Sequence, residues 1–231
     1  MTPDGVFSSR VAPITNLEFK KHAMSDTHFT SLDATTMDTT TAYRLLVGAV
    51  VPRPVAWITT RSNAGVVNVA PFSSFNYVAH SPPMLAVNIG NREGVLKDTA
   101  RNILETGEFV VNVSTVDNMD LMHASSAEYP PDVSEVEALG IELLPGQSVA
   151  VPRVARSPIQ MECRLERSIP LGRGLNTLYI GEILTFHIAS SVFDGRYIDS
   201  VKMRPIARLG GPLYAELGTL HTRVQLQKPP K

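Results

Sequence analysis

Two β-branched runs on either side of a short polar turn restrict the fold more than any other feature of this sequence. Residues 55–60 (Val-Ala-Trp-Ile-Thr-Thr) and residues 66–70 (Val-Val-Asn-Val-Ala) flank residues 62–65 (Ser-Asn-Ala-Gly). Such runs around a turn that contains Asn and Gly predict a β-hairpin. Pro52 and Pro54 precede it and exclude a helix there, because proline lacks the amide hydrogen that a helix interior needs. We therefore expect antiparallel strands in this part of the chain.

The other strand candidates are apolar or alternating runs bounded by Gly, Pro or polar residues. They are residues 84–89, 109–113, 159–166 and 178–188. Residues 172–174 (Gly-Arg-Gly) lie between the last two runs and are typical of a turn.

Three helices are expected, and a glycine ends each of them. Residues 42–46 are followed by Gly48, and residues 133–139 are followed by Gly140. The clearest helix lies between the strands at 84–89 and 109–113 and stops at Gly107. Its apolar face consists of Leu96, Ala100, Ile103 and Leu104. Many strands with few peripheral helices indicate a mainly β fold, a barrel and not a doubly wound sheet.

The composition is compatible with one domain of moderate size. The chain has 231 residues, 43% of them hydrophobic and 19% charged, which is enough to bury a core. The formal net charge of -1 gives no reason to expect nucleic acid or an anionic membrane as a partner, since both normally require a basic face. We expect the domain at residues 39–231. Residues 1–38, rich in Thr, Ser, Asp and His, are expected to form an extension that wraps a surface or a partner subunit.

The cysteine content and the N-terminus predict a cytoplasmic location. Cys163 is the only cysteine and cannot form an intramolecular disulfide. We expect it to be a small buried hydrophobic residue and not a catalytic thiol. The N-terminus carries Asp4 and Arg10 and has no apolar segment of signal-peptide length, and the longest apolar run, residues 45–51, is too short to span a membrane.

Residues 68–75 (Asn-Val-Ala-Pro-Phe-Ser-Ser-Phe) are the first candidate for a binding site, because they begin as a strand that proline then interrupts. The interruption exposes backbone donors and acceptors beside aromatic and small side chains, which a planar heteroaromatic ligand requires. An ordinary passage from strand to loop is the alternative. The candidate contacts are Asn68, Ala70, Pro71, Phe72, Ser73, Ser74 and Phe75.

The second candidate is a glycine-containing loop with cations at the start of the predicted helix, residues 91–99. Helix starts attract anions through unpaired amides and the helix dipole. Arg92 can bind a phosphate in bidentate fashion, Lys97 adds a point charge and Thr99 a hydroxyl, with Asp98 beside them. The alternative is a solvated first turn in which Asp98 is simply a favourable acidic residue. The segment is not a Walker loop, because Gly-Lys-Ser/Thr is absent.

Two weaker candidates lie further apart in the chain. The first comprises Trp57, Thr59 and Thr60 on the predicted hairpin, where the threonines could bond a ligand; a tryptophan buried in the core is the simpler explanation. The second is near the C-terminus, where adjacent glycines allow close backbone approach, although a plain turn explains the same residues. Its candidate contacts are Arg208, Gly210 and Tyr214.

Metal-dependent and hydrolytic chemistry receive no support from motifs. The six histidines are scattered, and no pair has the spacing of a His-x-x-x-His or Cys-x-x-Cys ligand set. No Gly-x-Ser-x-Gly nucleophile elbow is present, so acyl transfer is a poor hypothesis.

Taken together, four segments resemble the flavin reductase-like family of FMN-binding split-barrel proteins. The matching segments are residues 51–60, 68–75, 97–103 and 107–112, and the resemblance covers residues 41–214. It implies a six-stranded Greek-key barrel and a homodimer with FMN near the subunit interface. It also implies flavin contacts from residues 57–60 and 68–75, and a ribityl phosphate surrounded by the cluster at residues 92–99. The segment at residues 208–214 matches the family's C-terminal Arg-Leu-Gly segment, which contacts flavin from either subunit.

One departure from the family pattern concerns the electron donor. Members that use NADH or NADPH often carry Gly-Asp-His where this chain has residues 174–176 (Gly-Leu-Asn). The resemblance is therefore strongest to the flavoredoxin-like branch. An FMN-dependent oxidoreductase is the leading hypothesis, with NADH or NADPH as candidate donors and a small molecule or a redox protein as partner. There are two alternatives. The first is a flavoenzyme that acts directly on an organic substrate, as an oxygenase or reductase, with Tyr77, His80 or Asn176 as site residues. The second is an electron carrier without a substrate of its own.

Overall fold

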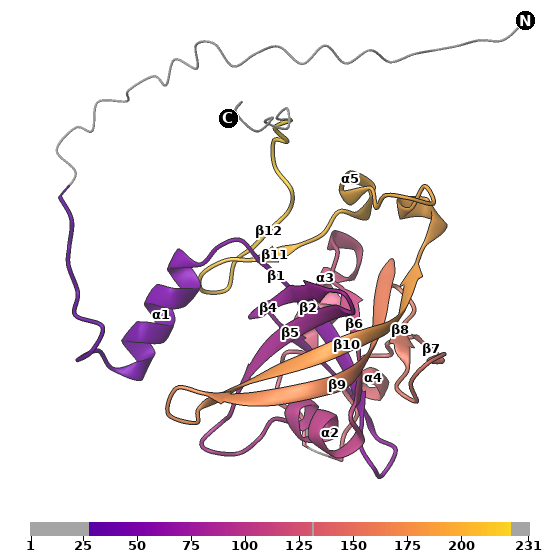
Figure 1. Ribbon diagram of the computed structural model, residues 1–231, viewed down its shortest axis with the longest axis horizontal. Coiled ribbons are helices and arrows are strands. Elements are labelled where there is room, and N and C mark those ends of the chain that lie inside the picture. Colours follow the sequence, from indigo (N-terminus) through magenta and orange to yellow (C-terminus); the bar gives the residue numbers. More distant parts are fainter. Residues whose placement is uncertain (1–27, 131, 223–231) are drawn as a thin grey trace, which may run out of the picture. The chain divides into compact units, whose positions relative to one another are not determined.

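The computed structural model describes residues 28–130 and 132–222, and in this part of the chain the core is a seven-stranded antiparallel sheet (Figure 1). Across the sheet the order is β3 (Val67–Phe72), β2 (Ala56–Arg61), β6 (Glu108–Val113), β9 (Ile159–Leu171), β10 (Asn176–Ile188), β5 (Pro83–Gly90) and β4 (Phe75–His80). All of the predicted strands are present. The mainly β fold class is confirmed.

The sheet is curled into a barrel by the chain itself. β3 and β4 lie at opposite edges of the sheet, yet only Ser73 and Ser74 separate them in the sequence. Phe72 and Phe75 are three residues apart and can span at most about 11 Å, so the two edges must meet at this point. The amide of Asn88 on β5 also donates to the carbonyl of Ser74 at 2.8 Å. The resemblance implied six strands; the seventh, β4, escaped prediction because its side chains are mostly exposed and do not alternate.

The proline in β3 does not end the strand where the sequence predicted. β3 continues through Pro71, which pairs with Trp57, and ends at Phe72. An edge strand tolerates proline because it has a neighbour on one side only. The interruption therefore falls at Ser73 and Ser74, two residues later than expected.

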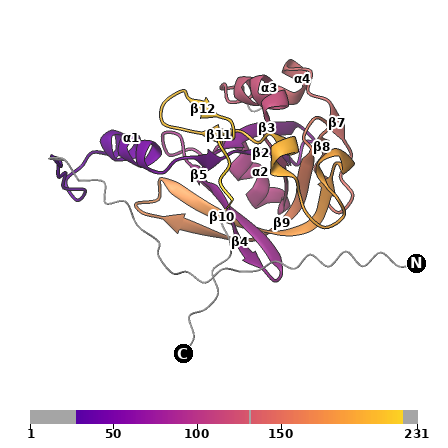
Figure 2. The same cartoon turned by 90° about the horizontal axis from the view of Figure 1, so that it is seen from above.

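The predicted hairpin is confirmed, and the turn predicted at residues 172–174 closes a second one. In the turn between β2 and β3, Gly65 has a φ of 89° and the Ser62 amide donates to the Val66 carbonyl at 2.9 Å. β9 and β10 have 13 residues each, and the predicted glycines lie in the turn between them. Figure 2 shows this hairpin and β4 on one side of the molecule, with α3 and α4 on the other.

The helices are short and peripheral. They are α1 (Thr39–Ala49), α2 (Asp98–Thr106), α3 (Met119–Ala124), α4 (Glu135–Ala138) and α5 (Ser200–Met203), with 3-10 turns at Val116–Asn118 and Ser190–Val192. α2 ends at Gly107 as predicted, with a φ of 71°. α1 instead passes through Gly48, α4 is shorter than expected, and α3 was not predicted. None of the helices in the described ranges is long and apolar enough to cross a membrane.

Three short strands complete the part that frames the site. β1 (Arg53–Pro54) pairs with β11 (Ala207–Arg208), which pairs with β12 (Tyr214–Ala215). A further pair, β7 (Leu143–Leu144) and β8 (Arg153–Val154), lies apart from these. The small sheet of β1, β11 and β12 brings the C-terminal segment beside the residues that follow α1 (Figure 1).

β2 is buried on both faces and separates two parts of the core. Ile58 packs with Phe109 and Tyr179 in the barrel interior, whereas Trp57 packs with Met122 of α3 on the other face. This burial explains why Ala56, Trp57 and Ile58 of β2 are all apolar and do not alternate with polar residues. Cys163, as predicted, is fully buried in the barrel core, and burial raises the pKa of its thiol.

The chain divides into two units, residues 1–38 and residues 39–231. Residues 28–38 contain no helix or strand; they form a local turn in which Asp33 accepts hydrogen bonds from the amide and hydroxyl of Thr35 at 2.8 and 2.7 Å. Most of the predicted extension, residues 1–27, lies outside the described residues, and its proposed wrapping role stays a prediction.

Candidate functional site

Two adjoining pockets contain most of the predicted contacts. The larger, of about 360 Å³, lies beside α1 and is called the α1 pocket. The smaller, of about 190 Å³, lies at the start of α2 and is called the α2 pocket. Pro71 and Ser126 line both, so the two pockets form one continuous site.

Lys97 is the cation in the α2 pocket that lacks a carboxylate partner. Its Nζ lies 5.8 Å from the centre of the Phe72 ring, and within the described residues it forms no ion pair or hydrogen bond. Although the residue is exposed as a whole, burial of its ammonium group lowers the pKa, as does the nearby charge of Arg92. Arg92 itself is paired with Glu128 at 2.8 Å. Lys97 is therefore the positive charge that an anionic ligand would satisfy.

The acidic groups of the α2 pocket are already engaged. Asp98 pairs with Arg101 on the first turn of α2. Glu135 accepts a hydrogen bond from the amide of Val69 at 3.2 Å, and burial raises the pKa of this carboxyl. A raised pKa favours the neutral form and so reduces repulsion of an anion in the pocket.

A buried polar network fixes the start of α2 against β2. Thr60 Oγ1 accepts from Asn102 Nδ2 at 3.1 Å, and the Asn68 side-chain amide lies 2.9 Å from Thr99 Oγ1. One orientation of the Asn68 amide gives hydrogen bonds to both its oxygen and its nitrogen. In that orientation the oxygen accepts from Thr99 and the nitrogen donates to Glu135 at 3.0 Å. Thr60 is thus a positioning residue beneath the pocket wall and does not line the pocket.

Trp57 and Thr59 also lie behind the site. Trp57 is fully buried, and its Nε1 donates to Ser125 Oγ at 2.9 Å. Ser125 in turn donates to the Met122 carbonyl at 2.8 Å and lines the α2 pocket. Thr59 donates to the Pro152 carbonyl at 2.7 Å. Because Trp57 and Thr59 are fully buried, they do not reach the pocket as the sequence predicted. Trp57 instead acts on the pocket through its hydrogen bond to Ser125.

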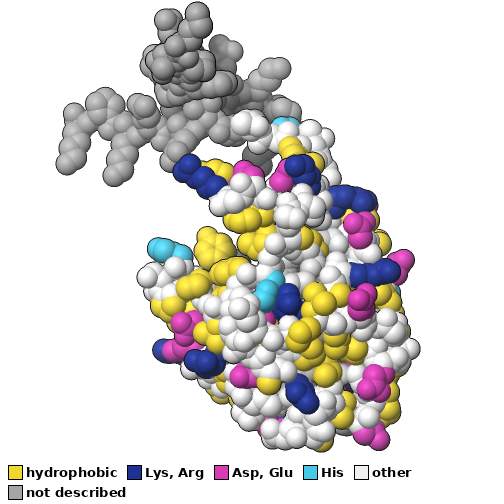
Figure 3. Space-filling model, turned by 90° about the vertical axis from the view of Figure 1, so that its right-hand side faces the viewer, with side chains coloured by type: hydrophobic (Ala, Val, Ile, Leu, Met, Phe, Trp, Pro, Cys, Tyr) yellow, Lys and Arg dark blue, Asp and Glu magenta, His cyan; other side chains and the backbone are white. Residues whose placement is uncertain are grey.

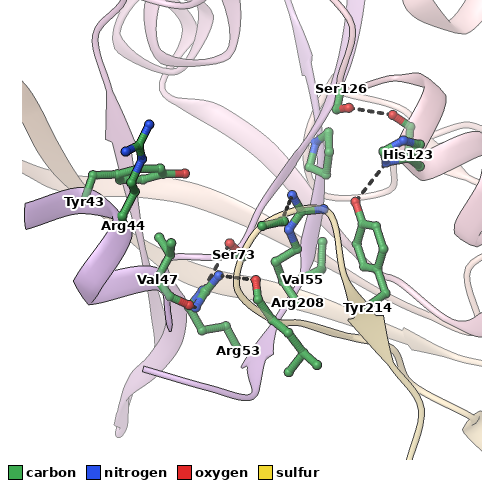
Figure 4. Close-up of a pocket in the computed structure, with 13 residues that line it drawn as sticks. Tyr43, Arg44, Val47, Arg53, Val55, Ser73, His123, Ser126, Arg208 and Tyr214 are labelled. Atoms are coloured by element: carbon green, nitrogen blue, oxygen red, sulfur yellow. Dashed lines mark hydrogen bonds between the residues drawn. The ribbon is translucent and has the colours of Figure 1, made fainter. Parts of the chain in front are cut away.

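Arg53 connects the walls of the α1 pocket. Its guanidinium donates to the carbonyls of Val47 and Val50 at 2.6 and 2.5 Å and to the carbonyl of Leu209 at 3.0 Å. Its Nε also donates to Ser73 Oγ at 3.4 Å. Figure 4 shows Arg53 beside Val47 and Ser73. Because one buried side chain holds the end of α1, the C-terminal turn and the β3–β4 junction, the pocket is built from segments far apart in the sequence.

Arg208 and Tyr214 form the opposite wall. Arg208 lies over the Tyr214 ring, 4.6 Å from its centre, and donates to the Gly211 carbonyl at 2.7 Å. The Tyr214 hydroxyl lies 3.1 Å from His123 Nδ1 (Figure 4). Gly210 does not line the pocket; a Cβ there would lie 3.4 Å from Gly48 Cα, so this glycine permits close approach to α1.

The structure brings most of the predicted contacts together and leaves out six. The residues that line the two pockets are Asn68, Ala70, Pro71, Phe72, Ser73, Arg92, Lys97, Asp98, Thr99, Arg208 and Tyr214. Trp57, Thr59, Thr60 and Gly210 lie behind the walls, as described. Ser74 is exposed outside both pockets, and Phe75 lines a third cavity because the chain turns at Ser73 and β4 leads away.

Sequence reasoning missed four groups of lining residues. They are Tyr43, Arg44 and Val47 of α1; residues 125–129 with Glu135 in the α2 pocket; His123 with Ser126 in the α1 pocket; and Arg53, Val55, Leu209 and Gly211, also in the α1 pocket. The run of small residues at 124–127 (Ala-Ser-Ser-Ala) was a usable signal, because small side chains allow a loop to approach a ligand closely. No comparable signal marked α1.

Comparison with known proteins gives a consistent result. Residues 47–205 match the flavin reductase like domain. The chain is 42% identical over 181 residues to the protein BH2278 of Halalkalibacterium halodurans, an alignment that covers 76% of this chain and 87% of that protein.

Solved structures agree with this match. Nitrilotriacetate monooxygenase component B from Bacillus cereus is 36% identical with a TM-score of 0.83, covering 85% of this chain and 100% of that one. The 2-nitrobenzoate 2-nitroreductase NbaA of Pseudomonas fluorescens is 31% identical with a TM-score of 0.75, covering 87% and 96%. A Shewanella frigidimarina protein with a split barrel domain, 22% identical with a TM-score of 0.74 and covering 87% and 100%, shares the fold. The chain therefore belongs to the flavin reductase-like family and has a split-barrel fold.

Proposed function

We propose that this protein binds FMN across the two adjoining pockets and works as an FMN-dependent oxidoreductase. The observation that carries the proposal is the pairing of a small pocket that contains the unpaired Lys97 with a larger pocket walled by aromatic and proline side chains. FMN has one phosphate and one planar ring system, which match these two ends. When bound, its isoalloxazine would supply the electron transfer, and the chain supplies binding and orientation.

The donor set of the α2 pocket fits a phosphate. Lys97 offers a charge, while Thr99 and Ser126 offer hydroxyls near the first turn of α2, whose free amides add to the attraction. Asp98 is held by Arg101, and the raised pKa of Glu135 limits its negative charge. The phosphate is thus expected to face cations and hydroxyls without an unscreened carboxylate beside it.

The α1 pocket fits the ring system. Pro71 and Tyr214 offer flat apolar surface, and Ser73, held by Arg53, offers a hydroxyl at the ring's polar edge. Arg53 makes this wall rigid because its bonds to three carbonyls and one hydroxyl leave it little freedom. A preorganised wall reduces the entropy that cofactor binding costs.

The electron donor is the second part of the proposal, and the two alternatives for it differ in what they require of the site. Asn176, at the position of the family's donor-associated histidine, lies at the tip of the β9–β10 hairpin, where it pairs with Gly90 and lines neither pocket. This favours direct reduction of a small organic substrate by the bound flavin as the second candidate. The names of the similar structures, a monooxygenase component and a nitroreductase, belong to oxidoreductases and support electron transfer in either form.

Anaerobic mixing tests the proposal. We expect purified protein to take up FMN with quenching of the flavin fluorescence, and NADH or NADPH to bleach the flavin absorbance of the complex. Bleaching by a reduced ferredoxin-like protein but by neither nucleotide would favour a carrier. Failure to bind FMN at all would refute the proposal.

We also propose a homodimer. No residue of α1 is buried although Leu45 and Leu46 are apolar, and a third cavity of about 410 Å³ is lined mainly by apolar side chains, Phe75 and Phe186 among them. Hydrophobic side chains gather in patches on the face shown in Figure 3. Such surface is typical of an interface.

Tyr77 and His80, considered above as site residues, line this third cavity. Sedimentation velocity at micromolar concentration should show a dimer, and a monomer would contradict this part of the proposal.

A further inference from the structure

The α1 pocket has a charge balance that a flavin ring does not explain. Its lining includes Arg44, Arg53, Arg208 and His123 and no Asp or Glu. The α2 pocket differs, because three carboxylates there accompany two cations. An oxidised isoalloxazine is neutral, a reduced one carries at most one negative charge, and the phosphate of FMN is already assigned to the α2 pocket. The arginines of the α1 pocket therefore exceed the needs of the cofactor.

These arginines are not equally free. Arg53 is engaged by three backbone carbonyls. Arg208 makes one hydrogen bond, to the Gly211 carbonyl, and lies over the Tyr214 ring. Arg44 is exposed and forms no hydrogen bond or ion pair with any residue in the part of the chain that the structure describes. Arg44 is thus the guanidinium with all of its donors available, and Arg208 retains some of its own.

The position of Arg44 places this charge beside aromatic surface. Figure 4 shows Tyr43 and Arg44 on α1 at one side of the pocket, with Arg208, Tyr214 and His123 on the other side. A guanidinium binds a carboxylate through two parallel hydrogen bonds, and aromatic side chains bind the flat faces of a ring. A ligand that combines a ring with a carboxylate satisfies both features.

We propose that the α1 pocket binds an aromatic carboxylate as the second ligand beside the cofactor, with Arg44 as the carboxylate-binding residue and Arg208 assisting. The inference rests on the proposed function for the location of the flavin. It adds the chemical class of the second ligand, an anion whose ring lies against Tyr43. The same anionic chemistry exists in the phosphates of a nicotinamide nucleotide, so the test must separate the two.

Benzoate and its neutral isostere benzamide are the probes. The FMN-loaded protein is titrated with each, and the shift of the flavin absorbance reports binding. We expect benzoate to bind at least about tenfold more tightly than benzamide, which is the effect of one charge-assisted hydrogen bond. In Arg44→Gln, benzoate affinity should fall about tenfold and benzamide affinity should stay the same. Arg167→Gln is the matched control, because Arg167 is exposed, pairs with Glu166 on β9 and lines neither pocket.

Three results would overturn the inference. The wild type could bind benzoate and benzamide with equal affinity, or Arg44→Gln could bind benzoate as tightly as the wild type does. The third is that Arg44→Gln loses affinity for NADH and keeps its affinity for benzoate. The FMN titration comes first and tests the proposed function by itself. If the protein binds no FMN, calorimetric titration of the flavin-free protein with benzoate still tests the carboxylate site. Arg44-dependent binding there would support the site although the proposed function had failed.

Discussion

Lys97→Gln is the substitution that most directly tests the assignment of the α2 pocket. The variant removes the one cation of the pocket that has no carboxylate partner among the described residues and keeps a polar side chain of similar length. We expect FMN to bind more weakly and riboflavin, which lacks the phosphate, to bind as before. The selectivity between the two ligands is the quantity of interest.

The magnitude follows from the partial exposure of Lys97. Two unit charges 4 Å apart attract by about 1 kcal/mol in water and about 4 kcal/mol at the effective dielectric typical of a protein surface. Because Lys97 is exposed as a residue while its ammonium is partly buried, an intermediate value of about 2 kcal/mol is appropriate. This corresponds to a loss of FMN affinity of about 30-fold. Added salt should weaken FMN binding to the wild type more than to the variant.

Fluorescence titration with FMN and with riboflavin, at two salt concentrations, measures these quantities. Lys202→Gln is the matched control, because Lys202 lies on α5 with an exposed side chain and lines neither pocket. Equal losses for FMN and riboflavin in Lys97→Gln would refute the phosphate assignment, since a lost charge interaction must depend on the phosphate. An unchanged affinity for FMN would do the same.

Three further predictions concern the scaffold. Gly181→Ala should lower the free energy of unfolding, measured by urea denaturation, by about 1–3 kcal/mol, because a Cβ there would lie 2.4 Å from Phe109 Cζ. Gly218→Ala is the control and should have little effect, because a Cβ at Gly218 meets nothing within 4 Å. Burial alone would raise the pKa of Glu162, but hydrogen bonds from three successive backbone amides and a histidine lower it on balance. Glu162→Gln should therefore destabilise the protein at pH 7 by about 2–3 kcal/mol, and the difference from wild type should shrink as the pH falls through the lowered pKa; a difference independent of pH would contradict this. Cys163 should resist iodoacetamide at pH 8 in the folded protein and react once unfolded, as mass spectrometry can show, because burial raises the pKa of its thiol.

The sequence alone determined the local elements and the side of the α2 pocket that the start of α2 provides. Residues 55–70 specify their hairpin through β-branched runs and a turn, and α2 is specified by its apolar spacing and Gly107. Lys97 and Thr99 were identifiable because a phosphate site at a helix start is assembled from neighbours in the chain. These features depend on interactions between residues close in sequence, which a pattern can report.

Only the tertiary structure decided the α1 pocket and the roles of the strand residues. Arg53 joins α1, the C-terminal turn and Ser73, and no local pattern signals a contact between residues 53 and 209. Trp57 and Thr60 were plausible ligand contacts until burial placed them behind the wall, where they position Ser125 and Asn102. Which face of a strand meets a ligand depends on what packs against each face. That packing involves distant segments, and it is fixed only when the barrel closes at Ser73 and Ser74.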